Sequence, residues 1–203
     1  MDIAVFENDI ETIRKMTFEF AFDHSFSKEY YHQWKQTYSD IEWIEVIESH
    51  ISDTIKKVTD EHNRRKMTWG GSHNLSLLYE LAPVYIEEEY WYRLLDLVKT
   101  DADLNSILRY HRYLVEKYPK ELLELYIFAF MQSGKNTSDR RAYAELASNM
   151  KMVIKDILEG KDDICAVVQQ IIKENPHRLA MIEELKNVLL KQEKKSKPIS
   201  NPK

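Results

Sequence analysis

Apolar residues recur three and four positions apart along most of the chain, which is the spacing of one face of an α-helix. In the first third this pattern predicts helices over residues 10–22, 30–38 and 41–58, with Asp9 and Asp40 as N-caps of the first and third. The second predicted helix carries an aromatic stripe: Tyr30, Tyr31, Trp34 and Tyr38. The third carries a seam of isoleucines: Ile41, Ile44, Ile47, Ile51 and Ile55.

The same spacing continues through the rest of the chain in shorter stretches. It predicts helices over 75–89, 90–98, 104–118, 120–132, 140–159, 164–175 and 177–190. Pro83 lies within the first of these, and we expect it to kink or divide that helix. No segment shows the two-residue alternation of a half-buried strand. The sequence therefore predicts an all-α protein of short antiparallel helices.

Residues that favour helix ends fall between the predicted helices. Helix starts are assigned to Asp103, Pro119, Thr137 or Ser138, Asp162 or Asp163, and Pro176. Gly134 and Gly160 are expected to end the helices that precede them. Residues 62–74 include Gly70 and Gly71, half of the 4 glycines in the chain, and are predicted to form a loop that ends the isoleucine-rich helix.

The glycine-containing loop is the expected boundary between two parts of the chain. Residues 1–69 are predicted to form an aromatic-rich helical cap, and residues 75–190 a region of helical repeats. Residues 191–203 are rich in lysine and poor in apolar side chains, so we expect a solvated, disordered basic tail.

A weak internal repeat links three segments of the second part. An offset of 28 residues places Tyr85 on Tyr113 and Leu94 on Leu122, and an offset of 57 residues places Pro119 on Pro176. Periods in this range are typical of stacked α-hairpins, in which each hairpin buries its apolar face only against its neighbours. The predicted architecture is an array of antiparallel helical hairpins, similar to a TPR superhelix or α-solenoid.

Four runs of aromatic and leucine-rich sequence resemble the helical C-terminal region of bacterial SWIM zinc-finger proteins. These runs are residues 81–98, 108–126, 140–155 and 171–185. The resemblance implies an α-helical, repeat-like segment that works beside a separate CxC…CxH zinc module. The chain departs from the family pattern because Cys165 is its single cysteine, so no zinc site is carried over.

Composition narrows the chemistry that the chain is expected to perform. The formal net charge is −5, and the 4 glycines are too few and too dispersed for a Gly-rich phosphate loop. No GxSxG or HExxH motif occurs, and Cys165 lies among apolar residues that favour a core position. No apolar run is long enough to span a membrane, and the opening residues do not resemble a signal peptide. These patterns favour a soluble cytoplasmic protein without enzymatic activity, cofactor or metal.

Clusters of acids with histidine are interpreted as solvated helix faces, because such neighbours are common on charged helices. They are Glu45, Glu48 and His50, and also Asp60, Glu61 and His62. The consecutive acids Glu87, Glu88 and Glu89 would need a second carboxylate array across a cleft for acid–base catalysis. An enzyme built from dispersed carboxylates and histidines stays a third candidate function.

Basic and aromatic residues alternate at two places within the predicted repeats. The candidate binding residues are Arg109, Tyr110, Arg112 and Tyr113, followed by Arg140, Arg141 and Tyr143. The favoured function is a non-catalytic scaffold that binds a protein partner. The alternative is a nucleic-acid-binding accessory module in which these arginines and the lysine tail contact phosphates while the tyrosines stack on bases. The oligomeric state is left open.

Overall fold

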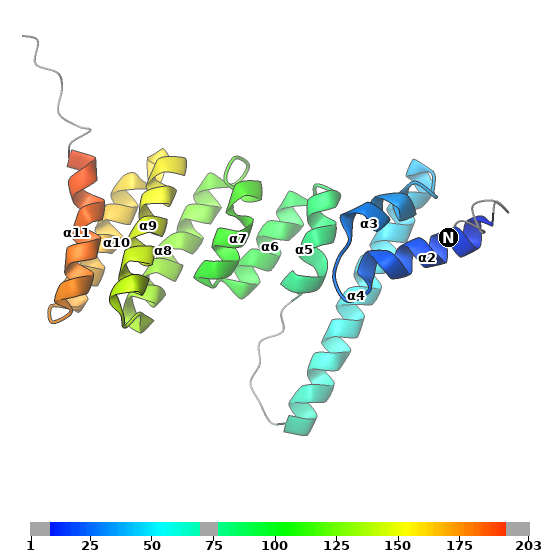
Figure 1. Cartoon of the computed structure of the whole chain (residues 1–203), viewed down its shortest axis with the longest axis horizontal. Coiled ribbons are helices and arrows are strands. Elements are labelled where there is room, and N and C mark those ends of the chain that lie inside the picture. Colours follow the sequence, from blue (N-terminus) through cyan, green and yellow to red (C-terminus); the bar gives the residue numbers. More distant parts are fainter. Residues whose placement is uncertain (1–8, 70–76, 194–203) are drawn as a thin grey trace, which may run out of the picture. The chain divides into compact units, whose positions relative to one another are not determined.

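The computed structural model describes residues 9–69 and 77–193, and side chains in these ranges except those of residues 66–69 and 190–193. The described residues form ten α-helices and one 3-10 turn with no strand, which confirms the all-α prediction. Figure 1 shows these elements in chain order. They are α2 (Ile10–Phe22), α3 (Lys28–Lys35), α4 (Asp40–Trp69), α5 (Leu78–Glu87), α6 (Trp91–Asp101), α7 (Leu104–Leu114), α8 (Pro119–Asn136), α9 (Arg140–Asp156), η1 (Leu158–Gly160), α10 (Lys161–Glu174) and α11 (Leu179–Glu193).

The chain folds as two compact units, Met1–Leu97 and Val98–Lys203, which divide within α6. The division into parts predicted from the sequence stays a prediction, since Gly70 and Gly71 lie outside the described residues. Helix α11 continues through Glu193, and the remainder of the predicted basic tail also lies outside the described residues. None of the described helices combines the length and apolar character that a membrane span requires.

In the first unit, helices α2 and α3 pack against each other, and helices α2 and α4 begin at caps that the local sequence supplies. The Asp9 side chain accepts a hydrogen bond from the Thr12 backbone N–H at 3.1 Å, which confirms the predicted N-cap of α2. The predicted cap at Asp40 is wrong, because Asp40 is already helical. Ser39 caps α4 instead, and its backbone N–H donates to the Glu42 carboxylate at 2.9 Å in a capping box.

Aromatic rings fill much of the first unit. Tyr31 and Trp34 are buried on α3, and Trp43 is buried on α4 with its ring centroid 4.8 Å from that of Trp34. Phe18 and Phe22 of α2 meet Trp34 edge-on, at 4.9 and 5.9 Å between centroids. The predicted aromatic stripe is therefore a packing surface between helices, and such tilted ring pairs contribute beyond their buried area.

Helix α4 departs from its prediction in length and in which face it buries. It continues through residues 62–69, where a loop was predicted, and ends only at Trp69. Of the predicted isoleucine seam, Ile47 and Ile51 are buried, whereas Ile41, Ile44 and Ile55 are 80%, 61% and 38% exposed. The core side of α4 is set by Trp43 together with Ile47 and Ile51, so the seam lies partly on the flank of the buried face.

Helix α5 contains Pro83 without being divided by it, and buries Leu81, Ala82 and Val84 completely. Pro83 has no N–H to donate to the Tyr79 carbonyl one turn earlier. The side chain of Tyr79 is 66% exposed, so this stretch of α5 borders solvent. Pro83 removes one backbone hydrogen bond from α5 but does not end the helix.

In the second unit, the predicted starts of α7 and α8 are confirmed. Asp103 accepts hydrogen bonds from the backbone N–H groups of Asn105 and Ser106 at 2.9 and 3.1 Å, and Pro119 occupies the first turn of α8. Gly134 does not end α8, as predicted, but is buried inside it. A Cβ at Gly134 would lie 2.9 Å from Cγ2 of Ile171 on α10, so the missing side chain permits close helix packing.

Other predicted boundaries are also wrong, including the helix starts assigned to Asp162 or Asp163 and to Pro176, since α10 begins at Lys161 and α11 at Leu179. Asp139, and not Thr137 or Ser138, caps α9 by accepting from the Ala142 N–H at 3.0 Å. Gly160 does not end α9, which stops at Asp156; it is the last residue of η1 and the N-cap of α10, and its φ of −85° shows that it is not needed for a left-handed turn. A Cβ at Gly160 would lie 2.4 Å from Cδ1 of Leu123, so it too marks a close contact.

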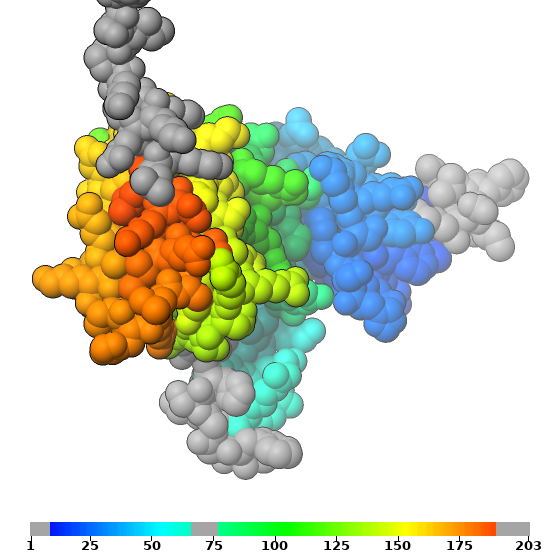
Figure 2. All heavy atoms as spheres, turned by 60° about the vertical axis from the view of Figure 1, so that its left-hand side comes forward, coloured from blue at the N-terminus to red at the C-terminus, as the bar shows by residue number. Residues whose placement is uncertain are grey.

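The helices of the second unit pack in a regular succession. Helix α8 packs on α7, α9 and α10, and α11 packs on α9 and α10. Figure 1 shows α9 and α11 side by side in the nearer layer, with α8 and α10 in the layer behind them. In the space-filling view α11 lies against its neighbours without a hollow between them (Figure 2). The arrangement of all the hairpins as a TPR-like superhelix stays a prediction.

The proposed repeat agrees with some helix positions and not with others. Helices α6 and α8 begin 28 residues apart at Trp91 and Pro119, and α7 and α10 begin 57 residues apart at Leu104 and Lys161. Leu94 and Leu122, matched by the first offset, are both fully buried. Leu179, which the second offset matches with Leu122, is 76% exposed, so the correspondence weakens at the start of α11.

Candidate functional site

The seven predicted binding residues divide sharply by exposure. All four arginines are exposed, on α7 (Arg109, Arg112) and at the start of α9 (Arg140, Arg141). Tyr110 and Tyr143 are only 7% and 6% exposed, so their rings belong to the core of the second unit. Tyr113 is half-buried. The tyrosines therefore serve chiefly in packing, while the arginines reach solvent.

The arginines differ in what they contact. The guanidinium of Arg112 lies 4.5 Å from the ring centroid of Tyr113 and donates a hydrogen bond to its hydroxyl. Burial raises the pKa of the Tyr110 phenol, while a hydrogen bond from Arg109 opposes that rise. Arg140 instead pairs with two carboxylates of α11, Glu183 at 3.1 Å and Glu184 at 3.3 Å.

A buried histidine links α7 to α8 and α9. His111 is 7% exposed, its Nε2 lies 3.2 Å from Oδ2 of Asp156, and its Nδ1 lies 3.1 Å from the Tyr126 hydroxyl. Burial raises the pKa of Tyr126, and the Asp156 charge adds to that rise. The C-terminal parts of α7 and α9 are therefore adjacent.

Among the four predicted arginines, only Arg112 is a direct sequence neighbour of this link. Arg112 follows His111 directly, and Lys155 precedes Asp156 with its side chain 84% exposed and its Nζ 3.8 Å from the Asp156 carboxylate. Arg141 lies about 22 Å back along α9 from Asp156, at 1.5 Å per residue. We call Arg109, Arg112 and Lys155 the basic edge. Sequence reasoning missed Lys155, because only the contact between His111 and Asp156 brings it to α7.

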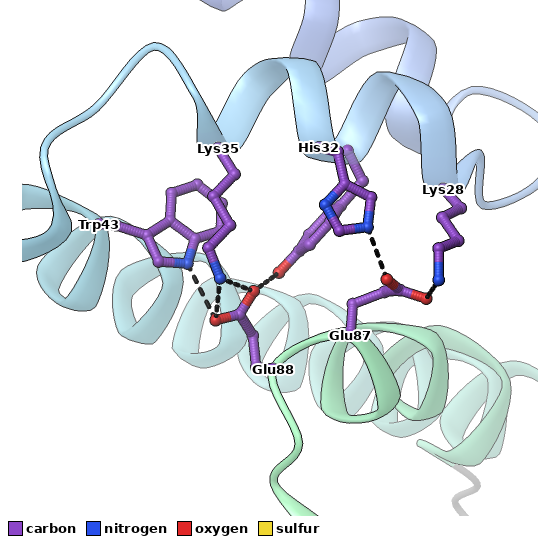
Figure 3. Close-up of polar contacts among 7 residues, drawn as sticks. Lys28, His32, Lys35, Trp43, Glu87 and Glu88 are labelled. Atoms are coloured by element: carbon purple, nitrogen blue, oxygen red, sulfur yellow. Dashed lines mark hydrogen bonds and ion pairs between the residues drawn. The ribbon is translucent and has the colours of Figure 1, made fainter.

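The acidic residues Glu87 and Glu88 form a second polar cluster, within the first unit (Figure 3). The Glu88 carboxylate accepts from the Tyr31 hydroxyl at 2.8 Å, from Lys35 Nζ at 2.8 and 2.9 Å, and from the Trp43 indole N–H at 3.0 Å. Its side chain is only 7% exposed. Burial and the Glu88 charge raise the pKa of Tyr31, so this phenol stays protonated and donates.

Glu87 completes the same cluster from the neighbouring position. Its carboxylate lies 2.7 Å from His32 Nε2 and 3.0 Å from Lys28 Nζ, and its side chain is 10% exposed. Together the two glutamates and their partners are called the Glu87–Glu88 clamp. Donors from α3 and α4 occupy both carboxylates, so the cluster is suited to joining helices rather than to acid–base catalysis. The basic partners Lys28, His32 and Lys35 are spaced four and three residues apart and so share one face of α3. This spacing is the one signal in the sequence that could have revealed the clamp.

Other residues that the sequence offered as candidates for catalysis or metal binding take part in ion pairs or in packing. Glu48 pairs with Arg93 at 2.8 Å, and His50 packs against aromatic rings, with its centroid 4.3 Å from that of Phe22. Cys165 is half-buried, and burial raises the pKa of its thiol, which disfavours the reactive thiolate. Within the described ranges, no group of three or more His, Cys, Asp or Glu side chains is arranged to hold a metal ion.

Comparison with protein-family models, with curated proteins and with solved structures finds no match for this chain.

Proposed function

We propose that this protein is a non-catalytic scaffold of stacked, TPR-like helical hairpins that binds an acidic segment of a protein partner along the basic edge. The segment would run beside the C-terminal parts of α7 and α9. Its carboxylates would pair with Arg109 and Arg112 on one side and with Lys155 on the other. From the resemblance to the helical region of SWIM zinc-finger proteins, we take only the architecture of stacked helices for this proposal.

The succession of helix contacts supports the scaffold part of the proposal. Helices of the second unit pack with their neighbours and their next neighbours, as in hairpin arrays whose exposed helix faces bind peptides. The polar clusters offer no competing catalytic constellation, because donors already occupy both Glu87 and Glu88. Architecture alone does not determine function, so the choice of partner depends on the surface chemistry.

The burial of Tyr110 and Tyr143 is the observation that carries the choice of a protein partner over nucleic acid. Single-stranded nucleic acid is bound by exposed aromatic rings that stack on bases, together with cations that contact phosphates. These two rings are enclosed, and the third predicted ring, Tyr113, already carries the Arg112 guanidinium on its face. Cations without stacking platforms suit carboxylates, and α7 itself contains no acidic residue that would compete for Arg109 and Arg112.

The test is a selection from a random peptide display library with the full chain as bait, followed by affinity measurements on the enriched peptides. We expect peptides rich in Asp and Glu, and a loss of roughly tenfold or more in affinity for Arg109→Glu combined with Arg112→Glu. Lys120→Glu combined with Lys135→Glu, on the exposed face of α8, is the matched charge control.

A single-stranded oligonucleotide measured in the same buffer separates the two partner classes. Tight oligonucleotide binding that falls steeply with salt and is abolished by the Arg109 and Arg112 variants would contradict the proposal. So would a selection that enriches no acidic peptide.

A further inference from the structure

Helix α4 is supported by the core over only its first half. Between Asp40 and Ile51 it buries Trp43, Ile47 and Ile51, whereas no side chain from Ser52 to Arg65 is buried. The second half also extends past α2, α3 and α5 in Figure 1. Isolated helical segments of this length are marginally stable in water, and packing of an apolar face normally sustains them. The second half of α4 therefore lacks the tertiary support that its length calls for.

An apolar stripe runs along the flank of this helix. Ile41, Ile44 and Ile55 are 80%, 61% and 38% exposed, and Val58 is half-buried. Their positions follow the alternating three- and four-residue spacing of a coiled-coil seam, with Glu48 and Ile51 at the two intervening places. The exposed part of the predicted isoleucine seam is thus suited to a second helix.

The distribution of charge along α4 indicates that the second helix is another copy of α4. Residues 40–53 contain five acidic residues and no Lys or Arg, whereas residues 54–65 contain four basic residues and two acidic ones. An antiparallel copy of α4 would place the basic half of one chain beside the acidic half of the other, and a parallel copy would place acid beside acid. Self-association is therefore favoured in one orientation.

We propose that two copies of this chain associate through an antiparallel pairing of their α4 helices. In the register that matches apolar positions, Ile41 lies opposite Val58 of the partner subunit, and Ile44 lies opposite Ile55 of the partner subunit. Each projecting half then packs on the flank of the other chain's first half. The contact is reciprocal and closes after two copies, as a two-fold interface requires. In this register, one residue of α4 faces Glu45 of the partner subunit, and Lys56 lies within one helical turn of that residue.

The proposal is tested first by the mass of the full chain in solution, measured by light scattering across a concentration series. We expect a dimer, and a dissociation constant raised roughly tenfold or more by Ile44→Glu or Ile55→Glu. Both side chains are exposed, so the variants should keep the helical circular dichroism of the original chain. Ile10→Glu on α2, whose isoleucine is 43% exposed, is the matched control and should leave the dimer intact.

A charge exchange tests the complementarity separately from the apolar contact. Lys56→Glu should weaken the dimer, and adding Glu45→Lys in the same chain should restore much of the affinity. Failure of the double variant to recover would overturn the electrostatic basis of the pairing. A chain that stays monomeric at every concentration, with its helical content intact, would overturn the whole proposal.

Cysteine crosslinking in a Cys165→Ser background tests orientation and register. The two positions 44 and 55 are about 16 Å apart along one helix, too far for a disulfide within a chain. A chain carrying Ile44→Cys and Ile55→Cys together should therefore form covalent dimers on oxidation, and each single variant should not. Efficient crosslinking of Ile44→Cys alone would show a parallel pairing and contradict the proposal.

Discussion

Each of the two compact units of the chain is stabilised internally by a different kind of interaction. In the first unit, two almost buried carboxylates and a cluster of aromatic rings join α3 and α4 to α5. In the second unit, aliphatic side chains and two close glycine contacts dominate, and the His111 link is a small polar addition. The first unit should therefore respond most to changes of charge and protonation, and the second to changes of volume.

The largest expected effect is a loss of volume in the second unit. Phe130 is fully buried and stacks on Tyr126 at 5.4 Å between ring centroids. Phe130→Ala should lower the free energy of unfolding by about 3–5 kcal/mol, because a cavity remains where the ring was. Urea unfolding measures the loss. Phe128→Ala, two residues earlier and 56% exposed, is the control, and equal losses for the two variants would contradict the packing described.

A loss of charge in the first unit should have the next largest effect. Glu88→Ala leaves the Tyr31 hydroxyl and the Trp43 indole N–H without their acceptor and should cost about 2–4 kcal/mol. Lys35 is 36% exposed and can turn to water, which keeps the cost below that of a fully buried pair. Thermal unfolding compares this variant with Glu89→Ala, at the exposed neighbouring position. If the Glu87–Glu88 clamp contributed nothing to stability, the Glu88→Ala and Glu89→Ala variants would unfold at the same temperature.

A smaller effect is expected from adding volume at a glycine contact. Gly134→Ala should cost about 1–3 kcal/mol, because its Cβ would lie 2.9 Å from Cγ2 of Ile171. The combined variant with Ile171→Ala should be more stable than the sum of the two single losses predicts, since the smaller residue makes room. Strict additivity in chemical denaturation would show that the two positions do not share this contact.

The smallest predicted effect is a pH dependence in the first unit. Burial among aromatic rings lowers the pKa of His50 from its usual value of 6.5, although Asp53 opposes the shift. As the pH falls below 6.5, the unfolded chain binds the proton first, so the stability that neutral His50 contributes is present above that pH and is lost below it. The NMR titration of the His50 ring should give a pKa below 6.5, and a value above 6.5 would contradict the burial described.

Sequence periodicity predicts the helices well because each one is encoded locally. The caps at Asp9 and Asp103 are examples, since the acceptor and its backbone donors lie within three residues. The glycine predictions were wrong because Gly134 and Gly160 are dictated by side chains on distant helices, Ile171 and Leu123. A tertiary contact of this kind leaves no local pattern.

The candidate site shows the same limit. Exposure of Arg109 and Arg112 follows from their place on the polar face of α7, which the spacing predicts. The burial of Tyr110 and Tyr143 depends on which helices cover them, and Lys155 joins the surface only through the contact of His111 with Asp156. The Glu87–Glu88 clamp likewise links residues about fifty positions apart, and only the complementary spacing of its charges was visible in the sequence.

Hydrogen–deuterium exchange of the full chain with a selected acidic peptide tests the central claim most directly. The proposal predicts slower exchange on binding in α7 and in the C-terminal half of α9, because a segment held by Arg109, Arg112 and Lys155 shields and steadies those turns. Protection confined to α8 and α10, or to the helices of the first unit, would contradict it.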